Sequence, residues 1–362
     1  MNGDEPIGRG AAFNTPNRFE RTAIETIKDD IVVEDDEGRP LRTTYYLDRS
    51  RSALAKNDAP DVPFTYSINP YRGCEHGCIY CYARPSHEYL GFSAGLDFES
   101  KIVVKPDIAT LLDVDLGKRG WEPQIVCLSG NTDCYQPAER HFRTTRAVLE
   151  VFLARRNPVG LITKNALVMR DLDLLARLAE QKLVTATVSI TTLDPEIARA
   201  MEPRASTPAR RLEALLALAA AGVPTGVNVA PIIPGLTDEE LPEILRAAAA
   251  RGARYAGYSL CRLQGAIEPL FRDWLARTMP DRAEKVMARI RDVHGDDLAG
   301  AGYHVRMRGR GPYAEAIARM FEVMTKRLGL DGQWPALDAT RFVRGKSGRT
   351  CGPEIQGELF PS

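Results

Sequence analysis

Short apolar runs alternate with helical patterns through most of the sequence, and this alternation restricts the fold more than any other feature. Most of the runs are four to nine residues long and rich in Val, Ile and Thr, which is typical of buried parallel strands. The runs are Ile102–Val104, Gln124–Leu128, Val159–Thr163, Val184–Thr192, Gly226–Ile233 and Tyr255–Leu260. Apolar residues recur at steps of three and four in the segments between them, namely Ala138–Arg156, Met169–Lys182, Thr207–Ala221 and Asp238–Arg251. Strand and helix repeated in this way predict βα units that pack as a parallel sheet or barrel, so the expected fold class is α/β.

The two ends of the chain differ from this central region. Residues 1–60 are polar and irregular, and we expect them to form a mobile or loosely docked arm. Helical patterns dominate after Ile267, in Pro269–Arg277, Asp281–His294 and Tyr313–Leu328. The sequence therefore predicts a polar N-terminal arm over residues 1–60, a core over 61–270, and a helical C-terminal extension with a tail over 271–362.

Composition excludes several classes of protein. Apolar residues make up 44% and charged residues 27% of the 362 residues, which is ordinary for a globular chain. No stretch approaches the roughly 20 apolar residues that span a bilayer, and the first thirty residues lack the apolar core of a secretory signal. We therefore expect a cytoplasmic protein without membrane contact. The 48 basic and 48 acidic residues cancel, so no overall charge attracts the chain to nucleic acid.

Three of the seven cysteines, Cys74, Cys78 and Cys81, are spaced C-x3-C-x2-C. Clustered cysteines in a reducing compartment more often hold a metal than form disulfides. Structural zinc needs four ligands, which would recruit His76, His87 or a distant cysteine. A 4Fe–4S cluster held by only three thiolates keeps one iron open to an external ligand. Both centres remain alternatives on spacing alone.

The spacing, with Tyr80 just before the third cysteine, resembles the radical S-adenosylmethionine (SAM) superfamily. The wider string SINPYRGCEHGCIYCYARPSHEYLG is similar to its spore photoproduct lyase-like branch, also called DNA repair photolyase-like. The resemblance continues through SGNTDCYQPAER, ITKNALVMRDLDLL, SITTLD, MEPRAS and GVNVAPIIPGLTD, and covers roughly residues 64–270. It implies a partial (β/α)6 barrel, a 4Fe–4S cluster on the three cysteines, and SAM chelated by the open iron.

The resemblance also implies cofactor-binding residues at the ends of strands. The turn after Gln124–Leu128 should receive the SAM amino group, although it lacks the glutamate common in the superfamily; an ordinary polar turn is the alternative. Lys164 should face the SAM carboxylate, with Arg204 as a rival, and Ser189 should contact SAM. Ala230 should pack against the adenine, and Tyr80 should offer its backbone there. The turn residues implied are Ser129, Gly130, Asn131, Thr132 and Asp133.

The remaining cysteines bear on the reaction. Photoproduct lyases place a hydrogen-donating cysteine just before a Ser-Asp pair, whereas here Asn131 precedes Thr132-Asp133. Cys134 follows the pair and is the candidate donor; a buried core residue is the alternative for it and for Cys127.

Partners and substrate follow from the same resemblance. It implies an electron donor such as flavodoxin or ferredoxin, and a DNA lesion as substrate. Radical chemistry on a protein, tRNA or small metabolite is an alternative, and a non-catalytic iron–sulfur or zinc protein is another. The basic segment His304–Arg310, with Arg341, Arg344, Lys346 and Arg349, could contact nucleic acid or form a solvated surface.

Overall fold

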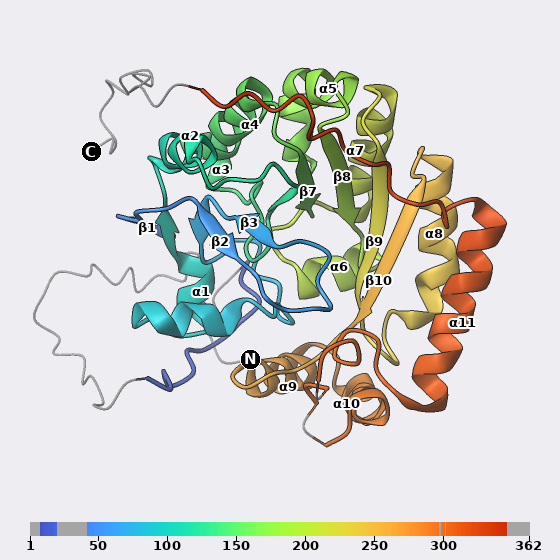
Figure 1. Ribbon diagram of the computed structural model, residues 1–362. Coiled ribbons are helices and arrows are strands. Elements are labelled where there is room, and N and C mark those ends of the chain that lie inside the picture. Colours follow the sequence, from blue (N-terminus) through green and yellow to red (C-terminus); the bar gives the residue numbers. More distant parts are fainter. Residues whose placement is uncertain (1–7, 20–41, 297, 301, 346–362) are drawn as a thin grey trace, which may run out of the picture.

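A seven-stranded sheet forms the centre of the fold in the computed structural model, which describes residues 8–19, 42–296, 298–300 and 302–345 (Figure 1). The strand order is β10-β9-β8-β7-β6-β3-β2, and all neighbours are parallel except β2 and β3. The strands are β2 (Leu54–Lys56), β3 (Tyr66–Ile68), β6 (Val126–Leu128), β7 (Val159–Thr163), β8 (Val184–Ser189), β9 (Thr225–Ile232) and β10 (Tyr255–Leu260). The six parallel strands confirm the predicted partial (β/α)6 barrel.

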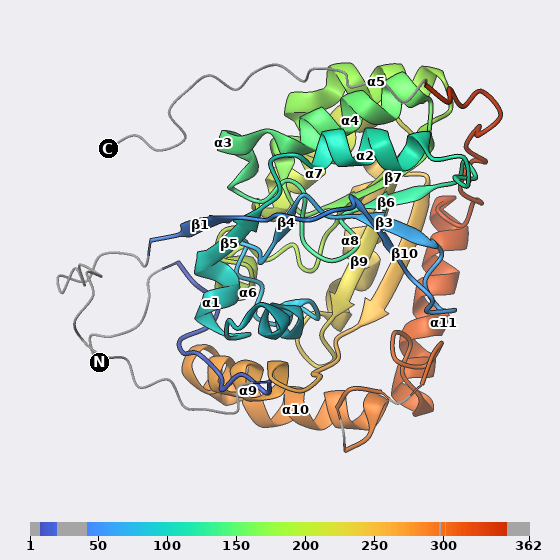
Figure 2. The same cartoon turned by 60° about the vertical axis from the view of Figure 1, so that its left-hand side comes forward.

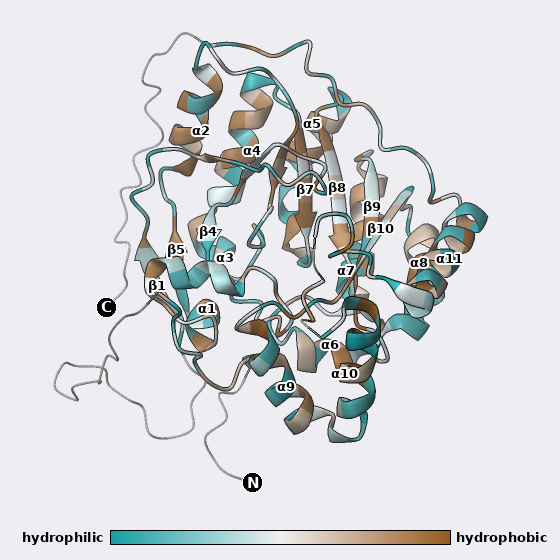
Figure 3. Ribbon diagram, turned by 60° about the horizontal axis from the view of Figure 1, so that its bottom comes forward, coloured by the Kyte–Doolittle hydropathy of each residue, from teal (hydrophilic) through white to brown (hydrophobic). Residues whose placement is uncertain are grey.

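Helices cover the outer face of this sheet (Figures 1 and 2). They are α2 (Ile108–Gly117), α4 (Thr144–Arg155), α5 (Leu172–Glu180), α7 (Pro208–Ala220), α8 (Leu241–Ala250) and α11 (Gly311–Leu328). Strand β7 is mostly hydrophobic and β8 alternates hydrophobic with weakly polar residues, whereas α4 and α11 carry both hydrophobic and strongly hydrophilic residues (Figure 3). One continuous cluster of buried side chains joins strands and helices, because each helix turns its apolar stripe to the sheet.

Two helix starts follow the predicted capping chemistry. The Thr207 side chain accepts a hydrogen bond from Arg210 N at 3.4 Å at the start of α7. The Asp194 side chain accepts from Glu196 N at 2.8 Å at the start of α6 (Pro195–Met201). Both helices have proline at the first helical position, where no amide hydrogen is needed.

The single helix predicted over Ala138–Arg156 is wrong, because the chain breaks at Arg143. This residue has φ 51°, which ends α3 (Glu139–Phe142) before α4 begins. The Glu139 carboxylate accepts from Thr145 N at 2.9 Å and so caps the second helix. Apolar spacing alone does not reveal such a break. The segment Met169–Lys182 likewise begins as a 3-10 helix, Ala166–Asp171, before α5.

The loose docking expected for residues 1–60 is wrong for the described parts. β1 (Thr44–Leu47) pairs in parallel with β5 (Lys101–Val104), and β2 joins the main sheet. β5, predicted as a strand of the central sheet, belongs to a separate three-stranded sheet of order β1-β5-β4, with β4 at Tyr71–Arg72. Backbone pairing fixes these segments to the two sheets. Residues 1–7 and 20–41 lie outside the described part, and the three-part division itself stays a prediction.

The C-terminal region wraps the barrel. Helices α9 (Ile267–Thr278) and α10 (Pro280–His294) lie at the carboxyl end of β10, and α11 packs beside α8 (Figure 1). A strap without helix or strand, residues 330–345, then crosses the amino ends of the strands. Its Trp334 stacks on Tyr255 at 4.4 Å between ring centroids, and its Val343 N donates to Arg155 O at 2.8 Å. No helix within the described residues is both long and apolar enough to cross a membrane.

The described basic residues of His304–Arg310 and of the 341–349 region do not form one continuous surface. Arg344 donates to Trp121 O, before β6, whereas Arg306 lies near the carboxyl end of β10, beside Asp61. The sheet separates these two places. Lys346 and Arg349 lie outside the described residues.

Candidate active site

The three clustered cysteines lie in one loop between β4 and the 3-10 helix η1 (Arg84–Leu90). Cys74 and Cys78 are buried, Cys81 is half-buried, and none of them forms a disulfide. The loop follows β3 and β4, so it lies over the carboxyl ends of the parallel strands, where such sheets bind ligands.

A backbone hydrogen bond and one arginine fix this loop. Cys74 N donates to Phe98 O at 2.9 Å, and Arg84 Nε donates to Cys78 O at 3.0 Å. The guanidinium of Arg84 is fully buried and pairs with the buried Glu99 carboxylate. A buried ion pair of this kind is retained only with further hydrogen bonds, which the loop supplies.

Residues 8–19 pack against the outside of the loop at Gly77. Gly77 has φ 68°, and a Cβ on it would lie 2.8 Å from Glu99 Oε2. A Cβ on Gly10 would lie only 1.9 Å from Gly77 O. Gly10 N also donates to Glu99 Oε2 at 2.9 Å. Both glycines are therefore required by close approach of the backbones.

The donor set suits a cationic iron–sulfur group. Burial is the main cause that raises the pKa of Cys74, Cys78 and Cys81. The charge of Asp133 raises the pKa of Cys74 further, the charge of Glu202 raises that of Cys78, and neighbouring cysteines add to both. Three thiolates at such a site need a positive group to offset their desolvation and repulsion. A 4Fe–4S cluster provides that charge and takes thiolate ligands.

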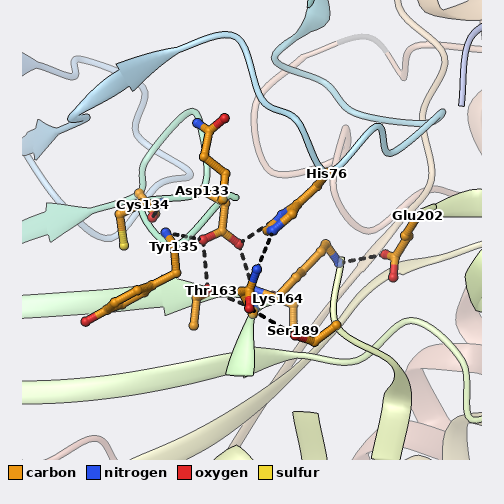
Figure 4. A network of polar contacts seen from close by, with 12 residues as sticks. His76, Asp133, Cys134, Tyr135, Thr163, Lys164, Ser189 and Glu202 are labelled. Carbon is orange, nitrogen blue, oxygen red and sulfur yellow. Dashed lines mark hydrogen bonds and ion pairs between the residues drawn. The ribbon is translucent and has the colours of Figure 1, made fainter. Parts of the chain in front are cut away.

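His76, inside the loop, joins it to the turn after β6 (Figure 4). Asn165 Oδ1 accepts from Leu167 N at 3.0 Å, so its Nδ2 is the donor that faces His76 Nε2 at 3.0 Å. His76 therefore carries its hydrogen on Nδ1, which lies 3.5 Å from Asp133 Oδ2. Burial lowers the pKa of His76 to about 4, so the ring is neutral.

Protein donors already occupy the Asp133 carboxylate. Oδ1 accepts from Thr163 Oγ1 at 2.7 Å and from Tyr135 N at 2.9 Å. Oδ2 accepts from Lys164 N at 2.7 Å and faces His76. In this arrangement Asp133 ties the turn to the end of β7 and to the cysteine loop.

Ser129 and Gly130 also accept hydrogen bonds from other residues of the chain. Ser129 Oγ accepts from Cys134 N at 2.7 Å, in a turn where Ser129 has φ 79°. Gly130 O accepts from Tyr82 OH at 2.6 Å, and Tyr82 directly follows Cys81. The turn and the cysteine loop are thus in direct contact.

Asn131 and Thr132 complete this turn. Asn131 N donates to Asn69 Oδ1 at 2.8 Å, and its side-chain amide donates to Ser86 Oγ at 3.2 Å. Thr132 Oγ1 donates to Tyr71 O at 2.8 Å and is buried. The side-chain carbonyl of Asn131 has no hydrogen bond among the described residues, which makes it the acceptor of the turn best suited to an added donor.

Lys164 extends from the end of β7 toward the neighbouring strand ends. Its Nζ donates to Ala230 O at 2.9 Å and lies 3.2 Å from Glu202 Oε1. It also lies 3.3 Å from Thr191 Oγ1 and 5.6 Å from the centroid of the Tyr80 ring. Burial, followed by the charge of nearby Arg211, lowers the pKa of Lys164 to about 8.

Glu202 is the centre of this second group of contacts. Its Oε1 accepts from Tyr80 OH and, at 2.6 Å, from Thr191 Oγ1. Its Oε2 accepts from Arg211, whose side chain is 1% exposed. Glu202 therefore links the cysteine loop, through Tyr80, to the ends of β7 and β8 and to α7.

Ser189 and Arg204 lie near this group in different settings. Ser189 is buried at the end of β8, and its carbonyl accepts from Arg211 at 3.2 Å. Arg204 lies 3.1 Å from Glu75 Oε1, and donates to Thr43 Oγ1 at 3.2 Å. Lys164 thus faces the strand ends directly, whereas Arg204 is held by a carboxylate of the cysteine loop.

Cys134 and Cys127 differ in their surroundings. Cys134 belongs to the main apolar cluster with Val148 and Leu149, and burial raises the pKa of its thiol well above the usual value. Cys127 alternates on β6 with Val126 and Leu128 of that cluster and is not part of it. A hydrogen-donor role for Cys134 stays a prediction, and this packing agrees with the alternative of a core residue.

Sequence reasoning missed His76, Asn165, Thr191, Glu202 and Arg211 as members of the site. The sequence indicates His76 only as a zinc ligand and gives Glu202 no role. Their common property is burial of a charged or polar group, which residue spacing does not reveal. The Glu-Pro-Arg triplet after a short helix was the available signal for Glu202.

Comparison with protein families gives a match to the radical SAM superfamily over residues 68–248. An uncharacterized protein of Mycobacterium tuberculosis is 39% identical over 254 residues, which cover 69% of this chain and 74% of the relative. An uncharacterized protein of Methanocaldococcus jannaschii is 30% identical over 175 residues, covering 48% and 63% of the two chains.

Two solved structures share the fold. Spore photoproduct lyase complexed with a dinucleoside spore photoproduct has a TM-score of 0.56 at 17% identity, covering 78% of this chain and 79% of the other. A mutant of that lyase with bound SAM and the same dinucleoside has a TM-score of 0.53 at 18% identity, covering 78% and 77%.

Proposed function

The chain belongs to the radical SAM superfamily, and from this premise we propose that Cys74, Cys78 and Cys81 hold a 4Fe–4S cluster whose open iron binds SAM. The single observation that carries the proposal is the placement of three free thiols in one buried loop beside Lys164, over the strand ends. We take residues 61–270 as the catalytic core, which the family match over 68–248 supports.

When bound and reduced, the cluster supplies the electron that cleaves SAM to methionine and a 5′-deoxyadenosyl radical. The chain itself binds and orients SAM and excludes water from the site. The Lys164 ammonium would face the SAM carboxylate, and the Asn131 side-chain carbonyl would accept from the SAM amino group. Tyr80 and Ala230 would border the adenosine, with the buried Ser189 near them. Asp133 acts indirectly, by holding the turn.

A flavodoxin or ferredoxin reduces the cluster, because amino-acid side chains do not deliver low-potential electrons. For the substrate we propose a DNA photolesion first, because the similar fold of spore photoproduct lyase holds a dinucleoside photoproduct. A second candidate is a protein, tRNA or small metabolite. It is favoured by Asn131 at the place of the donor cysteine and by the apolar packing of Cys134.

The test is anaerobic reconstitution with iron and sulfide, reduction with dithionite, and assay of 5′-deoxyadenosine after addition of SAM. The Cys78→Ala variant should lose iron and product while it keeps most of the fold by circular dichroism. The Cys261→Ala variant is the matched control, because Cys261 is also buried but lies outside the loop. An iron content of the Cys78→Ala variant equal to that of wild type would refute the assignment of Cys78 as a cluster ligand.

The substrate is tested with the dinucleoside spore photoproduct added to the reconstituted protein. Conversion to thymine nucleosides supports the first candidate. Normal 5′-deoxyadenosine formation without conversion selects the second.

A further inference from the structure

Arg262 lies at the carboxyl end of β10, beside the cysteine loop. It follows the last parallel strand and is half-buried. Its guanidinium carbon is 6.0 Å from the centroid of the Tyr82 ring, and Tyr82 directly follows Cys81. Arg262 therefore borders the same strand-end region as the candidate active site, although sequence spacing gave it no role.

The Arg262 guanidinium has no hydrogen bond and no carboxylate partner in the part of the chain that the structure describes. Two other arginines near the site are paired, Arg204 with Glu75 and Arg211 with Glu202. Arg262 differs from these two in having no carboxylate partner among the described residues.

The carboxylate of Asp61 is near Arg262 but is already engaged. Its Oδ1 accepts from Arg306 at 2.5 Å, and its Oδ2 accepts from Arg306 at 2.7 Å and from His304 N at 3.2 Å. Burial, followed by the charge of Arg306, lowers the pKa of Arg262, and the charge of Asp61 offsets this only in part. Burial and Arg306 both work against the cation, and a half-buried cation without a counter-ion is costly.

We propose that Arg262 binds an oxyanion of the substrate, a phosphate or a carboxylate. The planar guanidinium offers paired N–H donors that match such a group in two hydrogen bonds. An anion on Arg262 lies next to Tyr82 and hence next to the loop of cluster ligands. Arg262 then favours substrates that carry an oxyanion over substrates that lack one.

This inference rests on the proposed function, because it gives a substrate role to a residue at the edge of that site. The neighbouring exposed Tyr303, whose ring centroid is 5.0 Å from the Arg306 guanidinium carbon, makes this edge both cationic and aromatic.

The test measures anion binding to the full-length reconstituted protein by calorimetry at constant ionic strength. The probes are inorganic phosphate and acetate. The variants are Arg262→Gln and, as matched control, Arg254→Gln, which removes the same charge from the exposed amino end of the same strand. At least one probe should bind wild type and Arg254→Gln within twofold, and bind Arg262→Gln at least tenfold more weakly. Preferential loss of phosphate or of acetate identifies the anion.

Equal affinities of wild type and Arg262→Gln would overturn the proposal. So would an equal loss in Arg254→Gln, or the absence of anion binding by wild type. Formation of 5′-deoxyadenosine by the same wild-type sample separates the two proposals. If that product is absent while anion binding depends on Arg262, the proposed function fails and the anion site stands. If the product forms and the Arg262→Gln variant binds the anions as tightly as wild type, only the proposed anion site at Arg262 is refuted.

Discussion

Glu202 Oε1 lies 3.2 Å from Lys164 Nζ, and the same completely buried carboxylate also pairs with Arg211. One negative charge thus faces two positive charges at the ends of the strands. The remaining positive charge suits a carboxylate ligand, and Glu202 keeps the ammonium in place and ionised.

Replacement of Glu202 by Gln should weaken SAM binding about tenfold or more, or about 1.4 kcal/mol. The reason is that Lys164 and Arg211 then share no counter-ion, so the lysine loses its charge. Binding of 5′-methylthioadenosine, which has no carboxylate, should change little. Affinities from equilibrium dialysis of the reconstituted protein check this, with Glu240→Gln as control because Glu240 accepts from Thr192 and Leu193 at a neighbouring position. An equal loss for both ligands would indicate a merely structural role.

SAM binding should weaken as the pH rises through about 8. Burial lowers the pKa of Lys164 to about 8 from its usual 10.5, so the ammonium is present below this pH and is lost above it. The dissociation constant measured from pH 6.5 to 9.5 should therefore increase in the upper half of the range. In the Lys164→Arg variant the charge persists. A slope that is unchanged by this substitution would assign the titration to another group.

Asp133→Asn should destabilise the cluster-free protein by about 1–3 kcal/mol. The carboxylate accepts from Thr163, Tyr135 N and Lys164 N. In the asparagine variant an NH2 group, which cannot accept hydrogen bonds, would replace one carboxylate oxygen and face these donors. Urea denaturation gives the free energy of unfolding. Asp173→Asn, which weakens an exposed pair with Arg146, should cost less than about 1 kcal/mol. Similar losses in the two variants would contradict the central position of Asp133.

Gly77→Ala should reduce iron retention and stability more than Gly91→Ala does. Both glycines have positive φ, 68° and 79°, so both alanines carry backbone strain of about 1–2 kcal/mol. A Cβ at Gly77 also meets Glu99 Oε2 at 2.8 Å, whereas nothing lies within 4 Å of one at Gly91. The difference in iron per chain and in urea midpoint isolates the contact. Equal effects would show that strain alone matters.

The strands and the cysteine loop could be predicted because their signals are local. Buried parallel strands are continuous apolar runs, and Val159–Thr163 coincides with β7. The break at Arg143 could not, because it depends on Glu139 accepting from the backbone of the next helix. The family resemblance indicates Lys164, yet its partner Glu202 lies 38 residues later in the sequence (202 − 164 = 38). Contacts at that separation are created by the fold of the sheet, not by spacing.

The strap over residues 330–345 has a consequence for the order of events during synthesis. Its contacts join Trp334 to Tyr255, Asp338 to Lys182, and Val343 to Arg155. Each of these earlier partners leaves the ribosome well before the strap does. The amino ends of the strands therefore lack these contacts until residues 330–345 have been synthesised, and the strap can pack only on strands that the chain already contains.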